Sequence, residues 1–141
     1  MSYINTPSFN AWRGNSFEIV CLNHIRQLKT ALGISGVETQ EYAWSGKKTD
    51  PGVQIDLLID RKDGVINLCE MKFSNEPYEI TGDEYEKLKH RLSSFQEETN
   101  TDKAVHITLV SARGVRKNKY CDIVQRILTG DDLFAAPPGE W

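Results

Sequence analysis

The sequence has few of the residues that define disulfide-rich or zinc-binding proteins. Its 141 residues include three cysteines, Cys21, Cys69 and Cys121, and no two of them form a CxxC pair. An odd number of widely spaced cysteines argues against a disulfide framework and against a zinc knuckle. The three histidines show neither HxH nor HExxH spacing, so a zinc hydrolase is not expected.

Long apolar runs and a signal peptide are also missing. No run approaches the roughly 20 apolar residues of a membrane-spanning helix. The first ten residues, MSYINTPSFN, lack the basic and apolar regions of a signal peptide. Cys21 and Cys69 lie among apolar neighbours, which predicts that they are small core residues in a reducing environment. We therefore expect a cytoplasmic protein that does not contact a membrane.

The charge balance is mildly acidic, with a formal net charge of −3. Phosphate contacts dominate non-specific affinity for nucleic acid, so this charge argues against a protein that coats nucleic acid constitutively. It does not exclude a nuclease, because an acidic metal site is negative until cations fill it.

The length and composition predict one globular domain. Residues 1–12 are polar and weakly periodic, and we expect them to form an N-terminal extension. Residues 135–141, AAPPGEW, are rich in proline and predict a flexible tail. The domain itself is expected to cover residues 13–134.

Two segments show the apolar periodicity of helices. The first runs from Ser16 to Leu32, with Asn15 as a candidate N-cap and Gly33 as a candidate stop. The second runs from about Asp83 to Glu98. It starts with a capping box made by Thr81 and Glu84.

Strands are predicted from Val37 to Trp44, from Ala104 to Val110 and from Ile123 to Leu128. The clearest signal is a hairpin formed by Val53 to Asp60 and Val65 to Phe73, with a turn signal between them. Four alternating apolar residues of its first strand are expected on one face: Val53, Ile55, Leu57 and Ile59. These elements predict an α/β fold in which helices flank a mixed central β-sheet.

The length of the hairpin loop decides where its acidic residues lie. A three-residue loop of Lys62, Asp63 and Gly64, with Gly64 in the left-handed conformation, places Asp56 opposite Glu70 on the same face. A loop of even length would place them on opposite faces, because a slip of one residue turns every side chain over.

This arrangement suits the hydrolysis of a phosphodiester. Asp56 and Glu70 are the kind of ligands that Mg²⁺ (or Mn²⁺) takes, and the backbone carbonyl of Met71 could add a third. Lys72 follows Glu70 by two residues and therefore points to the same side. Its ammonium could orient the attacking water or stabilise developing negative charge.

The spacing of Asp56, thirteen residues and then Glu70-Met71-Lys72 resembles the PD-(D/E)XK nuclease pattern, although Ile55 stands in place of the proline. The resemblance implies a restriction-endonuclease-like core with the order αβββαβ and a Mg²⁺-dependent nuclease that acts on DNA. Many members contribute an acidic residue from the helix before the sheet, and Glu18 matches it. Glu18 also stands three residues after Asn15, as in a capping box, so both roles remain open.

Three longer stretches are similar to a narrower group, the C-terminal nuclease-like domain behind AAA-type ATPase modules of bacterial proteins. They run from Trp12 to Glu18, from Asp50 to Arg61 and from Ile66 to Pro77, within a match over about residues 11–134. The resemblance implies an AAA-type ATPase module as a partner in cis or in trans.

Residues that could contact nucleic acid are found in two places. Gln54 shares the expected face of Asp56, and a basic segment contains Arg113, Arg116, Lys117 and Lys119. These cations could follow a phosphate backbone. The alternative for Gln54 is a polar residue of an edge strand, and for the basic segment a solvated loop. His24 and His106 are interpreted as core or boundary histidines.

Two other functional classes remain open. The chain could keep the nuclease fold without turnover and bind nucleic acid or a partner protein. It could also serve as a structural domain in which Trp12, Trp44 and the C-terminal strand form an oligomer edge. A homodimer would suit an enzyme that cuts both strands of a duplex.

Overall fold

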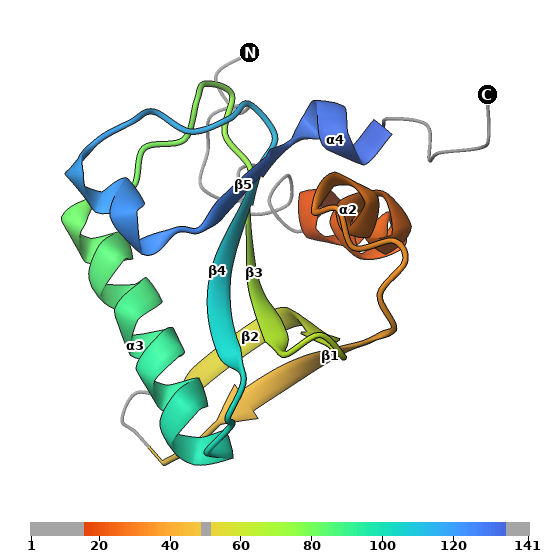
Figure 1. Ribbon diagram of the computed structural model, residues 1–141. Coiled ribbons are helices and arrows are strands. Elements are labelled where there is room, and N and C mark those ends of the chain that lie inside the picture. The colour runs from red at the N-terminus through yellow and green to blue at the C-terminus, as the bar shows by residue number, and fades with distance from the viewer. Residues whose placement is uncertain (1–15, 49–51, 135–141) are drawn as a thin grey trace.

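A mixed five-stranded sheet forms the middle layer of the fold in the computed structural model, which describes residues 16–48 and 52–134 (Figure 1). The strands lie in chain order: β1 Thr39–Gly46, β2 Val53–Arg61, β3 Val65–Lys72, β4 Ala104–Ser111 and β5 Arg126–Thr129. β1, β2 and β3 pair antiparallel, whereas β3, β4 and β5 pair parallel. The predicted α/β class with a mixed, helix-flanked sheet is confirmed, and this architecture is compatible with a restriction-endonuclease-like fold.

Several predictions fall outside the described ranges. These are the N-terminal extension over residues 1–12, the tail over residues 135–141, the N-cap at Asn15 and the oligomer contact of Trp12.

Helices cover both faces of the sheet (Figure 1). One face is covered by a helical segment over residues 16–23, by α2 Ile25–Ala31 and by α4 Gly130–Phe134. The other is covered by α3 Gly82–Thr99, which connects the parallel strands β3 and β4. Parallel strands need a crossover of this kind, because a tight turn cannot join their ends.

The predicted first helix is interrupted at one residue. His24 leaves the helical conformation, with φ −124°, and its Nδ1 lies 2.7 Å from the carbonyl oxygen of Val20. The helix then ends where the sequence predicts. Gly33 takes φ +76°, and the amide of Ile34 donates to the carbonyl of Lys29 at 2.9 Å, as in a Schellman motif.

The hairpin has the predicted register. Leu57 lies opposite Cys69 and Asp60 opposite Ile66, so the loop between the strands has an odd number of residues. Gly64 takes φ +93°, a conformation that glycine adopts without steric cost.

An irregularity in β2 corrects one prediction about its faces. Tyr42 pairs with Leu58 and Trp44 pairs with Ile55, so β2 has one residue more than β1 between these pairs, which is a β-bulge. The four apolar residues expected on one face are consequently divided between two clusters. Leu57 and Ile59 pack with the helices of residues 16–31, whereas Val53 and Ile55 pack with Phe95 of α3.

The bulge lies at Asp56 and Leu57. An extra residue locally reverses the alternation of side chains, which the sequence pattern alone did not show. Trp44, considered above as part of an oligomer edge, packs against Phe95 with ring centroids 5.2 Å apart and is half-buried, and its place in an oligomer edge stays a prediction.

The last predicted strand is shorter than expected. Residues Lys119–Ile123 form a 3₁₀-helix, because the side chain of Asn118 accepts a hydrogen bond from the amide of Tyr120 at 2.9 Å. At Gln125 the side-chain oxygen accepts from the amide of Ile107 in place of a backbone carbonyl. β5 therefore begins at Arg126, and α4 follows it as an element that the sequence did not predict.

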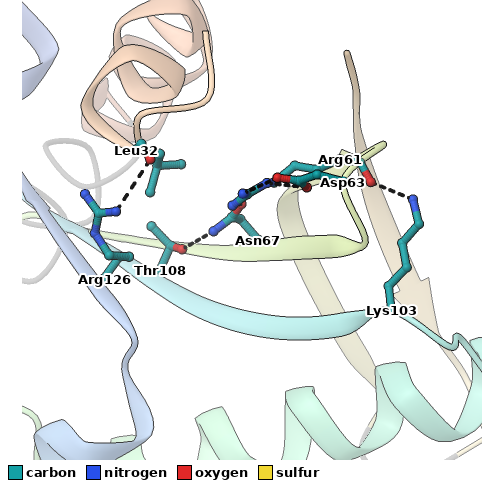
Figure 2. Close-up of polar contacts among 7 residues, drawn as sticks. All are labelled: Leu32, Arg61, Asp63, Asn67, Lys103, Thr108 and Arg126. Atoms are coloured by element: carbon teal, nitrogen blue, oxygen red, sulfur yellow. Dashed lines mark hydrogen bonds and ion pairs between the residues drawn. The ribbon is translucent and has the colours of Figure 1, made fainter. Parts of the chain in front are cut away.

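A chain of polar contacts crosses one end of the sheet (Figure 2). The amide nitrogen of Asn67 donates to the hydroxyl of Thr108 at 3.0 Å, and Arg61 donates to the amide oxygen of Asn67 at 3.2 Å. Lys103 donates to the carboxylate of Asp60 and to the carbonyl of Arg61. We call this group the loop-end cluster, because it lies beside the hairpin loop.

Candidate active site

The opposite end of the β2–β3 hairpin opens into a fork. In the described part of the chain the β2–β3 ladder ends at Leu57 and Cys69. Beyond this pair, β2 continues along β1, and β3 continues along β4 to the pair Lys72–Ser111. The fork is therefore bordered by the beginning of β2 and the carboxyl end of β3.

Asp56 and Glu70 occupy the two sides of the fork, because each is the next residue beyond the last pair of the ladder. Burial is the main cause that raises the pKa of Glu70, and the negative charge of Asp56 raises it further. Gln54 donates its amide to Asp56 Oδ1 at 3.1 Å. Gln54 and Asp56 therefore lie together, as the sequence predicts.

Glu70 is largely buried in the fork, with a side chain 12% exposed. Its Oε1 lies 3.3 Å from Nη1 of Arg91, which projects from α3. Burial nevertheless raises the pKa of Glu70 above its ordinary value, against the opposing effect of Arg91 and Lys72. Arg91 and Lys72 therefore do not fully compensate the cost of burying this carboxylate.

Lys72 contacts α3 as well. Its Nζ lies 3.2 Å from Glu84 Oε2, in the first turn of the helix. Thr81 caps this turn by accepting a hydrogen bond from the amide of Glu84 at 3.2 Å. Burial alone would raise the pKa of Glu84, but Lys72, Lys87 and Arg91 hold it below its ordinary value.

Glu18 reaches the fork from the other face of the sheet. Burial raises the pKa of its carboxyl, Asp56 raises it further, and Lys72 lowers it. All four residues of the predicted catalytic set therefore interact electrostatically across the fork. The capping role of Glu18 depends on Asn15, which is outside the described residues.

Sequence reasoning missed three side chains of this site: Tyr78, Glu84 and Arg91. Burial, together with the nearby carboxylates of Glu84 and Glu70, raises the pKa of Tyr78. Glu84 was interpreted only as a capping residue, and Arg91 stands on a helix face with many other charges. One signal in the sequence could have pointed to these side chains: α3 directly follows β3 in the order of the elements.

The predicted basic segment lies beside the N-terminal end of α3. Val115 forms a parallel bridge with Tyr78, so this loop follows the chain that leads from β3 into α3. Arg116 is paired with Glu76 at 3.3 Å, and Lys119 lies over the ring of Tyr120 at 5.1 Å. Nucleic-acid binding by Arg113, Arg116, Lys117 and Lys119 stays a prediction.

The carboxylate oxygens of the fork are the kind of ligand atom that Mg²⁺ prefers. Within the described part of the chain, no group of three or more His, Cys, Asp or Glu side chains is arranged to hold a metal ion. Mg²⁺ commonly takes only one or two carboxylates and keeps its waters. Four carboxylates, Glu18, Asp56, Glu70 and Glu84, face three cations, Lys72, Lys87 and Arg91, so a formal excess of one negative charge remains.

Comparisons with known proteins concern the fold. The chain shares its fold with a solved protein of unknown function. That crystal structure, AF1548, is 18% identical and aligns with a TM-score of 0.53 over 79% of this chain and 58% of its own. A repair endonuclease from Pyrococcus abyssi aligns at 16% identity and a TM-score of 0.47, over 76% of this chain and 43% of its own. No family model and no curated protein matches the chain.

The chain thus spans less than two thirds of either solved protein. Among the described helices, none has both the length and the apolar character to cross a bilayer.

Proposed function

We propose that this chain is a metal-dependent nuclease domain of the PD-(D/E)XK type that acts on DNA. Asp56 and Glu70 would hold Mg²⁺ (or Mn²⁺), with the backbone carbonyl of Met71 as a third ligand. Glu18 would support the metal from the helix. The observation that carries the proposal is the position of Asp56 and Glu70 on the two sides of the fork, with Lys72 two residues further along β3.

Each residue has a role that follows from its place. When bound, the metal ion would neutralise charge on the scissile phosphate and lower the pKa of a bound water. Lys72 would orient the attacking water or stabilise charge on the phosphoryl oxygens. Gln54, hydrogen-bonded to Asp56, would keep that carboxylate in one orientation.

A metal titration with a panel of nucleic-acid forms tests the proposal. Single-stranded, duplex and branched DNA would be incubated with Mg²⁺ or Mn²⁺ and with wild type, Asp56→Ala or Asp60→Ala. Asp60 is a matched control, because it lies on the same strand at the opposite end of the hairpin and is half-buried like Asp56.

We expect cleavage by wild type and by Asp60→Ala, and loss of cleavage in Asp56→Ala. The proposal is wrong if Asp56→Ala cleaves every DNA form as fast as wild type does.

A second candidate function is a nuclease-fold module without turnover that binds nucleic acid or a partner protein. The pairing of Glu70 with Arg91 and of Lys72 with Glu84 favours it, because these two residues of the predicted catalytic set already have a partner within the chain. Mn²⁺ titration monitored by calorimetry distinguishes the two. Binding that is lost in Asp56→Ala supports the nuclease, whereas no binding by wild type supports the inactive module.

The proposal extends to partners and location. An AAA-type ATPase module, in cis or in trans, is the expected partner, and a homodimer would suit cleavage of both strands of a duplex. A cytoplasmic location agrees with the free thiols of Cys21, Cys69 and Cys121.

A further inference from the structure

A cavity of about 320 Å³ lies beside the fork, between the beginning of β2 and the middle of α3. It is lined by Gly52, Val53, Gln54, Lys87, His90 and Arg91. Among these described lining residues two are cationic and none is acidic. This is a local reversal of sign in a chain whose net charge is −3. The chemistry of the lining therefore suits an anion.

The cavity is connected to the candidate active site through its two cations. Arg91 borders the cavity, while its Nη1 is buried, makes no hydrogen bond and lies 3.3 Å from Glu70 Oε1. Lys87 lies 3.6 Å from Glu84 Oε1, and its side chain is 63% exposed. An anion in the cavity would be one side chain away from the carboxylates of the site.

We propose that this cavity binds a backbone phosphate of the nucleic-acid strand, next to the phosphodiester that is cleaved in the fork. The inference rests on the proposed function and adds to it a contact that positions the strand. A guanidinium presents several N–H donors to phosphate oxygens, and a lysine adds a mobile charge. The amide of Gln54 borders the same cavity and links the strand contact to Asp56.

Fluorescence anisotropy with a short labelled oligodeoxynucleotide tests this contact. Binding would be measured over a range of salt concentrations, in Ca²⁺ and in EDTA, for wild type, Lys87→Met and Lys89→Met. Lys89 is the matched control. It lies on the same helix and is 52% exposed, but it contacts Glu86 and the ring of Tyr85 and does not line the cavity.

We expect Lys87→Met to weaken binding and to lower the slope of log affinity against log salt by about 0.7 for single-stranded DNA or about 0.9 for duplex DNA. Lys89→Met should leave the slope unchanged. An oligonucleotide with single uncharged methylphosphonate linkages provides a second measurement. At one position along the oligonucleotide, the methylphosphonate should weaken binding to wild type but should not weaken binding to Lys87→Met.

The outcomes separate this inference from the proposed function. If both lysine variants change the slope equally and no linkage distinguishes them, the cavity is not a phosphate site, and the nuclease proposal stands. If wild type binds no DNA form in Ca²⁺ or in EDTA, both the nuclease proposal and the phosphate site are wrong.

Discussion

The two ends of the β2–β3 hairpin are both polar, but their polar groups are satisfied to different degrees. At the loop end, Arg61 contacts both carboxylate oxygens of Asp63, at 2.6 and 2.9 Å, and Asn67 donates to Thr108 at 3.0 Å (Figure 2). At the fork, the ion pairs are longer, at 3.2 Å for Lys72–Glu84 and 3.3 Å for Glu70–Arg91.

The loop end and the fork also differ in how well their buried polar atoms are hydrogen-bonded. Glu84 Oε2 and Arg91 Nη1 are buried at the fork, and their ion-pair partners at 3.2 and 3.3 Å are not aligned for a hydrogen bond. A buried charge that is paired without a well-aligned hydrogen bond is only partly compensated for its burial. The loop-end cluster has partners within the chain and stabilises the fold, whereas the fork retains charges that a ligand could satisfy.

The largest effect is expected from Glu70→Gln. The substitution keeps the size of the side chain but removes the charge that the metal would need. The rate of DNA cleavage should therefore fall by about a hundredfold or more. Each factor of ten in this rate corresponds to a loss of about 1.4 kcal/mol of transition-state stabilisation. Stability should not decrease, because burial disfavours the charged form of Glu70. A variant that cleaves like wild type would contradict the role assigned to the fork.

The loop-end cluster should respond in the opposite way. Asn67 is 1% exposed, and Asn67→Ala removes the partner of the buried hydroxyl of Thr108 and of Arg61. We expect the free energy of unfolding to fall by about 2 kcal/mol in urea, with cleavage per folded molecule unchanged. Gln96→Ala, at an exposed amide on α3, is the control and should change little. A loss of cleavage without loss of stability would remove the contrast between the two ends.

The pH dependence of stability sharpens the same contrast. Because the pKa of Glu70 is raised in the folded chain, Glu70 holds its proton more tightly in the folded chain than in the unfolded chain, where its ordinary value is 4.5. The stability from Glu70 is thus complete below that value and is lost as pH rises through the folded pKa. Glu70→Gln cannot titrate, so wild type should lose stability relative to the variant as pH rises from 4.5 to neutral.

Urea unfolding of the two proteins at several pH values measures this difference. Glu84, whose pKa is lowered, contributes with the opposite sign but is present in both proteins. If wild type instead loses stability relative to Glu70→Gln as the pH falls, Glu70 is stabilised in its charged form.

The smallest effect is expected at the rim of the loop-end cluster. Lys103 contacts Asp60 and the carbonyl of Arg61, with a side chain that is 34% exposed. Such a partly exposed pair contributes about 0.5–1 kcal/mol, so Lys103→Met should lower the unfolding free energy by that amount. High salt should reduce the difference between Lys103→Met and wild type, and a salt-independent loss would instead indicate lost packing.

The sequence predicted the local geometry of the hairpin well. The odd loop ending at Gly64 and the register from Leu57–Cys69 to Asp60–Ile66 follow from short-range rules. Loop length sets the register of a hairpin, and the strand period of two sets the side of each residue. The helix stop at Gly33 and the cap at Thr81 are equally local.

The sequence could not show the bulge in β2 or the contacts of α3. The bulge depends on how β1 pairs with β2, and the apolar alternation of Val53 to Ile59 gives no sign of it. The sequence also predicts too early a start for the last strand, because the side-chain hydrogen bond of Asn118 supports a 3₁₀-helix over Lys119–Ile123 and regular pairing with β4 begins only at Arg126.

By itself, then, the sequence determined the register of the hairpin and so which residues lie at its open end, because spacing along neighbouring strands sets their relative position. Only the tertiary structure decided what surrounds them. Glu84 and Arg91 reach Lys72 and Glu70 because α3 packs across the sheet. That packing depends on the whole apolar face around Phe95, which no local pattern encodes.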